Sequence, residues 1–229
     1  MDELIIRPIA QIRTDFQEKF GIPRQSGRVE ELTGTIVFAP EFRNQDALRG
    51  IEEFSHLWLI FDFSASHRDK WSPTVRPPRL GGNTRVGVFA TRSPFRPNPL
   101  GLSCVKFLSL EQTAHEGTVI HVAGVDLLDG TPIIDIKPYI PYADAHPEAT
   151  GSFADTHKDD RLAVDIPPEL LSAIPEAKRN AVIACLSEDP RPSYQDDPER
   201  IYSMAFAGLD IHFRVQNGIA AVIRIDKKD

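Results

Sequence analysis

Residues 102–136 read LSCVKFLSLEQTAHEGTVIHVAGVDLLDGTPIIDI, and this segment carries the clearest evidence of the fold class. Three runs within it, Leu102–Leu110, Thr118–Val122 and Ile133–Ile136, are rich in apolar and β-branched residues. Glycine and aspartate separate the runs, and both residue types favour turns. The pattern predicts three short strands joined by turns.

Further β-type runs lie upstream of that segment, and turn residues again separate them. No helical period lies between consecutive runs, which disfavours a doubly wound α/β sheet. The pattern predicts a mainly β fold whose N-terminal part is a single-sheet antiparallel barrel. The upstream strands are predicted at Ile5–Ile12, Thr33–Phe38, Leu57–Phe63 and Arg85–Phe89.

The composition turns polar around residues 144–160, which is typical of a domain boundary or a long surface connection. We therefore expect two units. The first, residues 1–150, would be the barrel, and the second, residues 151–229, would be a small α+β domain.

The C-terminal part contains one helix pattern and one hairpin pattern. Apolar residues from Leu170 to Cys185 recur at the spacing of one helix face, and Pro175 is expected to kink or delay that helix. An Asn217-Gly218 turn between two apolar runs predicts a β-hairpin.

The composition is that of a folded, soluble protein, with 41% hydrophobic and 26% charged residues. The N-terminus lacks a signal-peptide pattern and no apolar run could cross a membrane, so we expect a cytoplasmic protein without a membrane partner. Cys104 and Cys185 lie far apart in apolar stretches and are predicted to be buried free thiols. The histidines show no ligand spacing, so no metal site is expected.

Charge is strongly segregated along the chain. The net charge of −7 argues at first against a polyanionic partner. Residues 68–106, however, hold eight basic residues and a single acidic one, Asp69. Such a segment fits a local site for a polyanion or an anionic ligand, and it also fits a solvated basic loop.

Several common catalytic motifs are missing from the sequence. No glycine-rich nucleotide motif follows a strand, and neither a Gly-x-Ser-x-Gly elbow nor a His-Glu-x-x-His helix occurs. Arg92 and Arg96 stand out instead, because neighbouring prolines restrict the loop that carries them. Their guanidinium groups could bind a carboxylate or phosphate, or they could pair with acidic residues elsewhere.

The turn from Asp126 to Asp129 has two interpretations. Its aspartates, followed by Gly130, suit a tight turn in which carboxylates accept bonds from local N–H groups. Alternatively, the turn holds a polar ligand and one carboxylate accepts a proton from a nucleophilic nitrogen. His67 follows the Leu57–Phe63 run, and a single histidine there carries little weight alone.

The run RVGVFATRSPFRPNP, residues 85–99, resembles the signature of the TrmO family of S-adenosylmethionine-dependent tRNA methyltransferases. The resemblance extends over nearly the whole chain, because other stretches similar to the family follow in the same order. These stretches are residues 19–25, 54–58, 75–82, 126–139 and 189–192.

The resemblance implies methyl transfer from S-adenosylmethionine to N6-threonylcarbamoyladenosine, next to the anticodon of tRNA. It also implies a single-sheet β-barrel with a small C-terminal domain, a homodimer, and the tRNA anticodon loop as partner. By matching motif, the cofactor pocket would be formed by Pro23, Arg24, Gln25, His67, Arg92, Leu102, Asp126, Leu127, Leu128 and Asp129. The tRNA phosphates would be contacted by Arg76, Arg79, Arg85 and Arg96.

The implied reaction needs a group that takes a proton from a poorly nucleophilic nitrogen. Asp126, Asp129 and His67 are the candidate bases by motif position, and Arg92 or Arg96 is the candidate cation for the threonyl carboxylate. Two alternatives stay open. One is a methyltransferase of the same fold with another substrate, and the other is a non-catalytic module that binds S-adenosylmethionine or tRNA.

Overall fold

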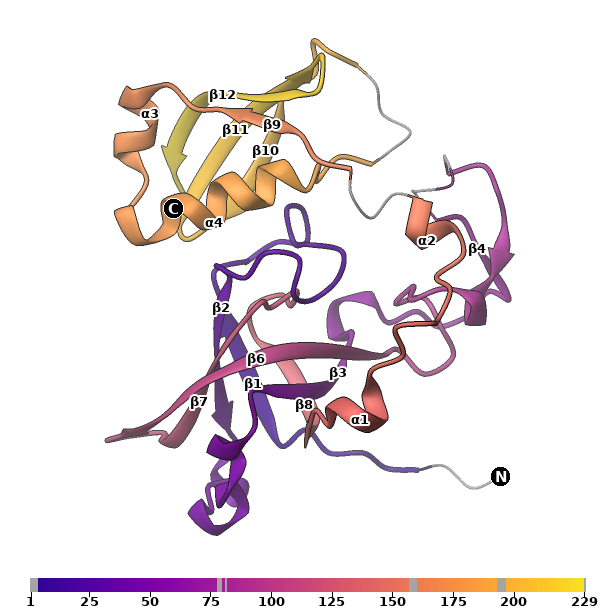
Figure 1. The fold of residues 1–229 in the computed structure, drawn as a ribbon, viewed down its shortest axis with the longest axis vertical. Helices are drawn as coiled ribbons and strands as arrows, with labels where there is room; N and C mark the ends of the chain where they lie inside the picture. Colours follow the sequence, from indigo (N-terminus) through magenta and orange to yellow (C-terminus); the bar gives the residue numbers. More distant parts are fainter. Residues whose placement is uncertain (1–3, 78–79, 81, 157–159, 193–196, 229) are drawn as a thin grey trace.

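Six antiparallel strands close a barrel in the order β1-β2-β7-β6-β3-β8 (Figure 1). The computed structural model describes residues 4–77, 80, 82–156, 160–192 and 197–228. The predicted barrel is confirmed. Its strands are β1 Ala10–Thr14, β2 Thr33–Phe38, β3 His56–Asp62, β6 Leu100–Thr113, β7 Gly117–Ala123 and β8 Thr131–Pro138.

Strand alternation fills the barrel with apolar side chains. In β3, Leu57, Leu59 and Phe61 are buried, while the residues between them are partly exposed. Gly101 on β6 lies opposite Phe61, and a Cβ at Gly101 would come within 2.1 Å of the Phe61 ring. Only glycine leaves room for that ring, so this position fixes how closely β3 and β6 pack.

A second sheet, with the order β10-β11-β12-β9, forms the C-terminal unit together with two helices (Figure 1). This agrees with the predicted α+β class. The predicted hairpin is also confirmed, since Asn217 and Gly218 have φ values of 50° and 75° at its turn. The elements are β9 Ala163–Asp165, β10 Tyr202–Phe206, β11 Leu209–Gln216, β12 Ile219–Lys227, α3 Pro168–Ala173 and α4 Glu176–Ser187.

The predicted single helix is broken rather than kinked. Helix α3 ends before Ile174, whose ψ of 127° is extended, and α4 begins after Pro175. A proline disfavours the helical conformation of the residue before it and supplies no N–H, so two short helices replace one.

Two predicted strands are shorter in the structure. Within Arg85–Phe89, only β5 (Val86–Gly87) is a strand, and it pairs with β4 (Thr74–Val75) as a two-stranded ribbon. The chain then turns into a 3-10 helix, which the Thr91 N–H closes by bonding to the oxygen of Val88, and the Val88 side chain is buried. Similarly, β1 starts at Ala10 rather than Ile5, and residues 4–8 are exposed.

Short helical turns link the strands. None of the helices in the described ranges is long and apolar enough to span a membrane. The short helices are η1 Pro40–Phe42, η2 Gln45–Leu48, η3 Ile51–Glu53, η4 Ser64–Ser66, η6 Val88–Ala90, α1 Pro141–Asp144 and α2 Phe153–Thr156.

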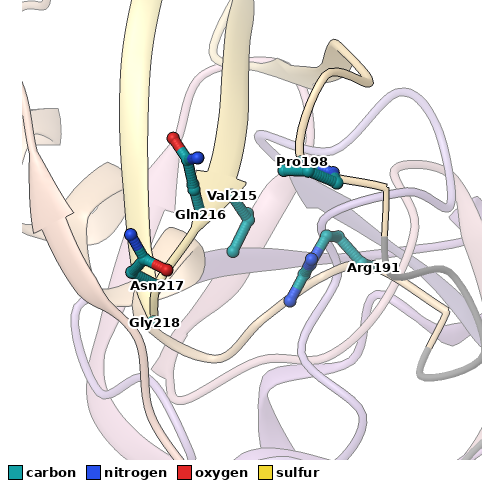
Figure 2. Close-up of a pocket in the computed structure, with 6 residues that line it drawn as sticks. All are labelled: Arg191, Pro198, Val215, Gln216, Asn217 and Gly218. Carbon is teal, nitrogen blue, oxygen red and sulfur yellow. The ribbon is translucent and has the colours of Figure 1, made fainter.

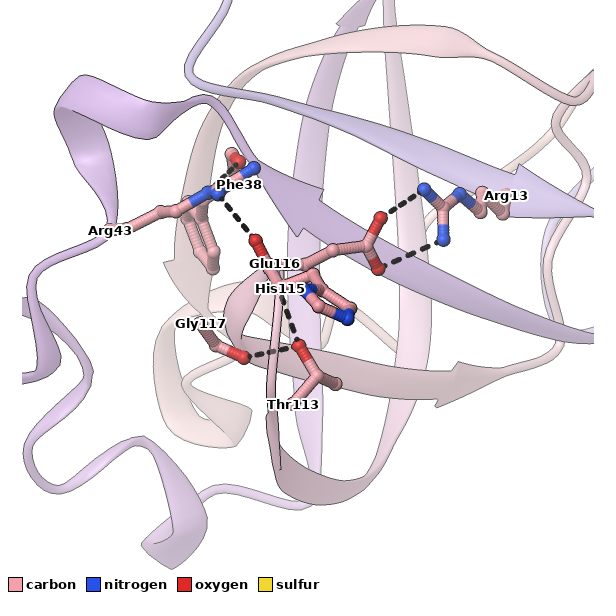
Figure 3. A network of polar contacts seen from close by, with 7 residues as sticks. All are labelled: Arg13, Phe38, Arg43, Thr113, His115, Glu116 and Gly117. Atoms are coloured by element: carbon pink, nitrogen blue, oxygen red, sulfur yellow. Dashed lines mark hydrogen bonds and ion pairs between the residues drawn. The ribbon is translucent and has the colours of Figure 1, made fainter.

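A polar network holds one end of the barrel together (Figure 3). Arg13 on β1 makes two hydrogen bonds to the carboxylate of Glu116, in the turn between β6 and β7. Arg43 donates to the carbonyl oxygens of Phe38 and His115, at 3.0 Å in each case. The turn is thereby tied to β1 and to the end of β2, strands that lie far from it in sequence.

Candidate functional site

Three of the predicted site segments meet beside the first half of β6. Arg92 donates a hydrogen bond to the side-chain oxygen of Gln25. Next to Gln25, the Ser26 hydroxyl accepts a 3.1 Å bond from the N–H of Cys104. On the same strand, the Ser103 hydroxyl donates to Asp126 Oδ1 at 2.6 Å. The structure therefore brings the Arg92 loop, the loop around Gln25 and Asp126 together.

The backbone of Leu102 faces this meeting point. The Phe63 N–H bonds to the oxygen of Pro99, and such bonded pairs alternate along an antiparallel ladder. Leu102 and Ile60 therefore form a non-hydrogen-bonded pair, and the Leu102 N–H and C=O point away from β3. They point to the edge where the Ser26 hydroxyl is bound, so the strand offers one donor and one acceptor there.

Asp126 has the most perturbed carboxyl in this site. Burial raises the pKa of Asp126 to about 6, although hydrogen bonds from Ser103 and Ser26 and the charge of Arg92 act in the opposite direction. A carboxyl with this pKa can exchange its proton close to neutral pH.

Asp129 lies at the other end of the same turn and is used differently. Its Oδ1 accepts a 2.9 Å bond from the N–H of Thr14, and Arg13 lies close enough to interact with its charge. The side chain of Leu127 is buried in the core, and the oxygen of Leu128 accepts a 2.6 Å bond from the next strand. The Asp129 carboxylate therefore faces β1 rather than the Ser103 side of the turn.

His67 stands at the end of η4 with its side chain exposed. Its Nε2 lies 2.7 Å from Asp62 Oδ1, at the end of β3. Lys19 binds the segment just before it, through the oxygen of Ala65 at 2.6 Å and the hydroxyl of Ser66 at 2.9 Å. Lys19 thus links the His67 segment to the loop that carries Pro23, Arg24 and Gln25.

That loop, residues 15–32 between β1 and β2, is packed between the two sheets (Figure 1). Phe16 is fully buried with its ring 5.0 Å from that of Phe206, and Phe20 stacks on Tyr202 at 6.2 Å. A Cβ at Gly21 would come within 2.5 Å of a methionine side chain on β10. The C-terminal sheet therefore supports the loop from behind.

The two residues that open the motif of this loop have different surroundings. Pro23 is buried, whereas Arg24 is exposed and donates a 2.9 Å bond to the oxygen of Arg191 in the C-terminal unit. The shape of the loop therefore depends on both units.

The predicted tRNA-binding arginines separate into two groups. Arg76 and Arg85 are exposed at the end of the β4–β5 ribbon where the connecting loop joins the two strands, and Arg79 lies outside the described residues. Arg96 turns back and donates to the oxygens of Thr91 and Ser93, at 3.1 and 3.4 Å. It therefore holds its own loop in shape.

A cavity of about 270 Å³ lies in the C-terminal unit (Figure 2), and none of the predicted site residues lines it. Arg191, which lines it, forms an ion pair of 2.8 Å with Asp189. Across the described ranges, no cluster of three or more potential ligand side chains could hold a metal ion. The cavity is lined by Arg191, Pro198, Val215, Gln216, Asn217 and Gly218.

Sequence reasoning missed the residues that hold the candidate groups in place. Ser103, Ser26, Asp62 and Lys19 each bond to a predicted site residue or to its neighbour in the chain. Ser103 could have been found from its position next to Leu102. Adjacent strand residues point to opposite faces, so the two side chains of this pair must lie on opposite sides of β6. Lys19 gave no such signal, since its partner is distant in sequence.

Known families and structures match the chain over nearly all its length. Residues 11–145 match the model of the tRNA-methyltransferase O N-terminal domain, and residues 159–228 match the TrmO C-terminal domain. The tRNA (adenine(37)-N6)-methyltransferase of Escherichia coli is 38% identical over 100% of both chains. The protein of the same name from Eikenella corrodens is 47% identical over 74% of this chain and 95% of its own.

The fold gives the same result. A crystal structure of TrmO from Pseudomonas aeruginosa superimposes with a TM-score of 0.78 and 33% identity, over 98% of this chain and 100% of that one. Sequence, domain order and fold agree, and this chain belongs to the TrmO family.

Proposed function

We propose that this protein methylates the N6 nitrogen of adenine 37 in tRNA, with S-adenosylmethionine as methyl donor and N6-threonylcarbamoyladenosine as acceptor. Relatives named as tRNA (adenine(37)-N6)-methyltransferases support the reaction. The observation that carries the proposal is the Ser103–Asp126 hydrogen bond beside Arg92 and the open edge at Leu102.

The proposed cofactor site lies at that edge of β6. When bound, S-adenosylmethionine would supply an electrophilic methyl group on a sulfonium centre. The backbone N–H and C=O of Leu102 suit the donor and acceptor edge of its adenine, and Arg92, oriented by Gln25, suits its carboxylate. We assign the remaining contacts to Pro23, Arg24, His67 and the turn from Asp126 to Asp129.

Asp126 is the proposed base. The lone pair of the acceptor nitrogen is delocalised into the purine and the carbamoyl group, so losing its proton makes it a better nucleophile. As the new N–C bond forms and the C–S bond breaks, the nitrogen's proton passes to the Asp126 carboxylate. Asp129 is a weaker candidate because its carboxylate faces β1 rather than the Ser103 side of the turn, and His67 is weaker because its Nε2 is paired with the Asp62 carboxylate.

The threonyl carboxylate needs a cation at the site. Arg92 suits this role better than Arg96, because Arg96 is held by backbone oxygens of its own loop. A single guanidinium can serve two carboxylates through its separate N–H edges, so one Arg92 could bridge donor and acceptor.

Calorimetric binding of S-adenosylmethionine, followed by methylation assays, tests the proposal. We expect saturable binding to the unmodified protein and its loss in Arg92→Ala. Methyl transfer should be faster to threonylcarbamoylated tRNA than to the same tRNA without that group. Transfer to another acceptor would favour a different substrate, and binding without transfer would indicate a non-catalytic module.

We also propose that residues 1–150 form the catalytic domain and that residues 151–229 form a supporting domain. Two chains form a homodimer in this proposal, and the dimer acts in the cytoplasm, where tRNA is found. Leu100 and Leu102 support the dimer, because their apolar side chains are exposed on the outer face of β6. Sedimentation of the purified protein tests the oligomeric state.

A further inference from the structure

Two large aromatic side chains are exposed next to the β4–β5 ribbon. Trp71 is 51% exposed and Phe89 is 73% exposed. Their ring centroids lie 6.3 Å apart and the ring planes are inclined by 32°. Side chains of this size usually contribute to a core or an interface, so an exposed pair marks a surface with a partner.

The backbone around this pair is well fixed. Thr74 pairs with Gly87 in the ribbon, and the Val88 N–H bonds to the oxygen of Pro73 at 3.0 Å. The Ser72 hydroxyl donates to the oxygen of Thr74 at 2.8 Å. A partner that covers the two rings would therefore need to order little of the main chain.

Two exposed cations lie at the other end of the same ribbon, where its connecting loop begins and ends. Since Val75 pairs with Val86, the next residues in register are Arg76 and Arg85, and both are exposed. Neither makes a hydrogen bond or an ion pair within the portion of the chain that the structure describes. Two like charges at one end of a short ribbon repel each other, and a bound polyanion would remove that repulsion.

We propose that Trp71 and Phe89 form a stacking platform for an unpaired base of the anticodon loop, while Arg76 and Arg85, at the other end of the ribbon, contact phosphates of neighbouring nucleotides. The inference rests on the proposed function and names the RNA feature recognised. Exposed rings flanked by cations match single-stranded nucleic acid, because each base presents a flat face and each linkage a negative charge. Double-stranded RNA would offer no free base to stack.

Salt dependence separates the two kinds of contact. Binding of a fluorescently labelled anticodon stem-loop is measured by anisotropy over a series of salt concentrations. Loss of one stacked base should weaken binding by about 5- to 150-fold, without changing the salt slope, in Trp71→Ala and Phe89→Ala. Arg76→Ala and Arg85→Ala should each reduce the slope by about 0.7.

Matched variants show whether the rings act by stacking. Phe89→Tyr keeps an aromatic ring and should bind as the parent does, whereas Phe89→Leu keeps an apolar side chain and should bind as weakly as Phe89→Ala. The chain has only two tryptophans, Trp58 and Trp71. RNA should therefore quench the emission of the parent and leave that of Trp71→Phe nearly unchanged.

The proposal is overturned if Phe89→Leu binds RNA as well as the parent, or if Trp71→Ala and Phe89→Ala leave affinity unchanged. It is also overturned if either variant dissociates a parent dimer, since the rings would then contact a second copy. Cofactor binding in every variant confirms an intact barrel. If the parent methylates tRNA and these variants bind tRNA normally, the stacking platform is refuted and the proposed function stands. If the parent neither binds nor methylates tRNA, the proposed function is refuted as well.

Discussion

The Ser103 hydroxyl and the Asp126 carboxylate lie 2.6 Å apart, joined by a hydrogen bond from β6 to the turn after β7. The bond stabilises the charged carboxylate and so opposes the burial that raises the pKa of Asp126 to about 6. Ser103 is itself buried, so water cannot easily replace its hydroxyl.

Removing that hydroxyl should raise the pKa of Asp126 further. We expect Ser103→Ala to move the acidic limb of the methylation rate upward by about one pH unit, because a lost hydrogen bond of about 1.4 kcal/mol corresponds to that shift. Values of kcat/KM for methylation, measured across the pH range, test this shift. Ser103→Thr keeps a hydroxyl and should retain the pH–rate profile of the parent. If the acidic limb of Ser103→Ala does not shift, the group that titrates in that limb is not Asp126.

The raised pKa of Asp126 also makes stability depend on pH. A carboxyl with a higher pKa in the folded state stabilises the fold when protonated, fully below its ordinary pKa of 3.8, and loses this contribution as pH rises through about 6. Asp126→Asn should therefore be about 1–3 kcal/mol more stable than the parent near pH 8, and equally stable below about pH 3. Denaturant titrations at several pH values test this, and a pH-independent difference would contradict it.

Gln25 and Arg92 should act as a coupled pair in cofactor binding, because one orients the other. We expect Arg92→Ala to weaken binding of S-adenosylmethionine more than Gln25→Ala does. The double variant should lose less binding free energy than the two single variants lose together, and the difference, the coupling energy, should be about 0.5–3 kcal/mol. Calorimetric titration of the parent, the two single variants and the double variant gives this coupling energy. Arg49 is an exposed arginine paired with nearby Asp46, so Arg49→Ala serves as a control that should bind S-adenosylmethionine normally.

Truncating Phe16 should test how far the C-terminal sheet supports the loop of residues 15–32, which carries Pro23, Arg24 and Gln25 of the proposed cofactor site. Its ring is fully buried against Phe206, so Phe16→Ala should lower the free energy of unfolding by about 3–5 kcal/mol. It should also weaken cofactor binding under conditions where the variant is folded. Tyr142→Ala, at a side chain 92% exposed, should change neither quantity; loss of stability with unchanged cofactor affinity would show that the loop keeps its shape alone.

Local patterns predicted most of the fold. The hairpin turn at Asn217-Gly218 and strand β2 needed only short-range signals, and both are confirmed. Two missed strands have contacts that are distant in sequence. β9 has three residues and pairs in parallel with β12. β10 pairs with the adjacent β11, but its Phe206 also packs on Phe16 in the loop between β1 and β2. A short run cannot reveal such partners, because its own propensity is weak.

The residue types of the candidate site could be proposed from the sequence, but their arrangement could not. Asp126 and Asp129 look equivalent in the sequence, yet one carboxylate faces Ser103 and the other caps the end of β1. Arg92 and Arg96 also look alike in the sequence, yet only Arg96 folds back on its own loop. Turn geometry and loop packing make these distinctions, and both arise from contacts far apart along the chain.

The position of the loop between β1 and β2 also has a consequence for synthesis on the ribosome. The loop is synthesised well before Tyr202 and Phe206, on which it packs. A nascent chain could close its barrel once β8 has emerged, but Phe16 and Phe20 would still face water. Residues 202–206 must therefore be synthesised before the loop can pack, and chains released before that point would lack the surface on which the proposed methyl-donor site depends.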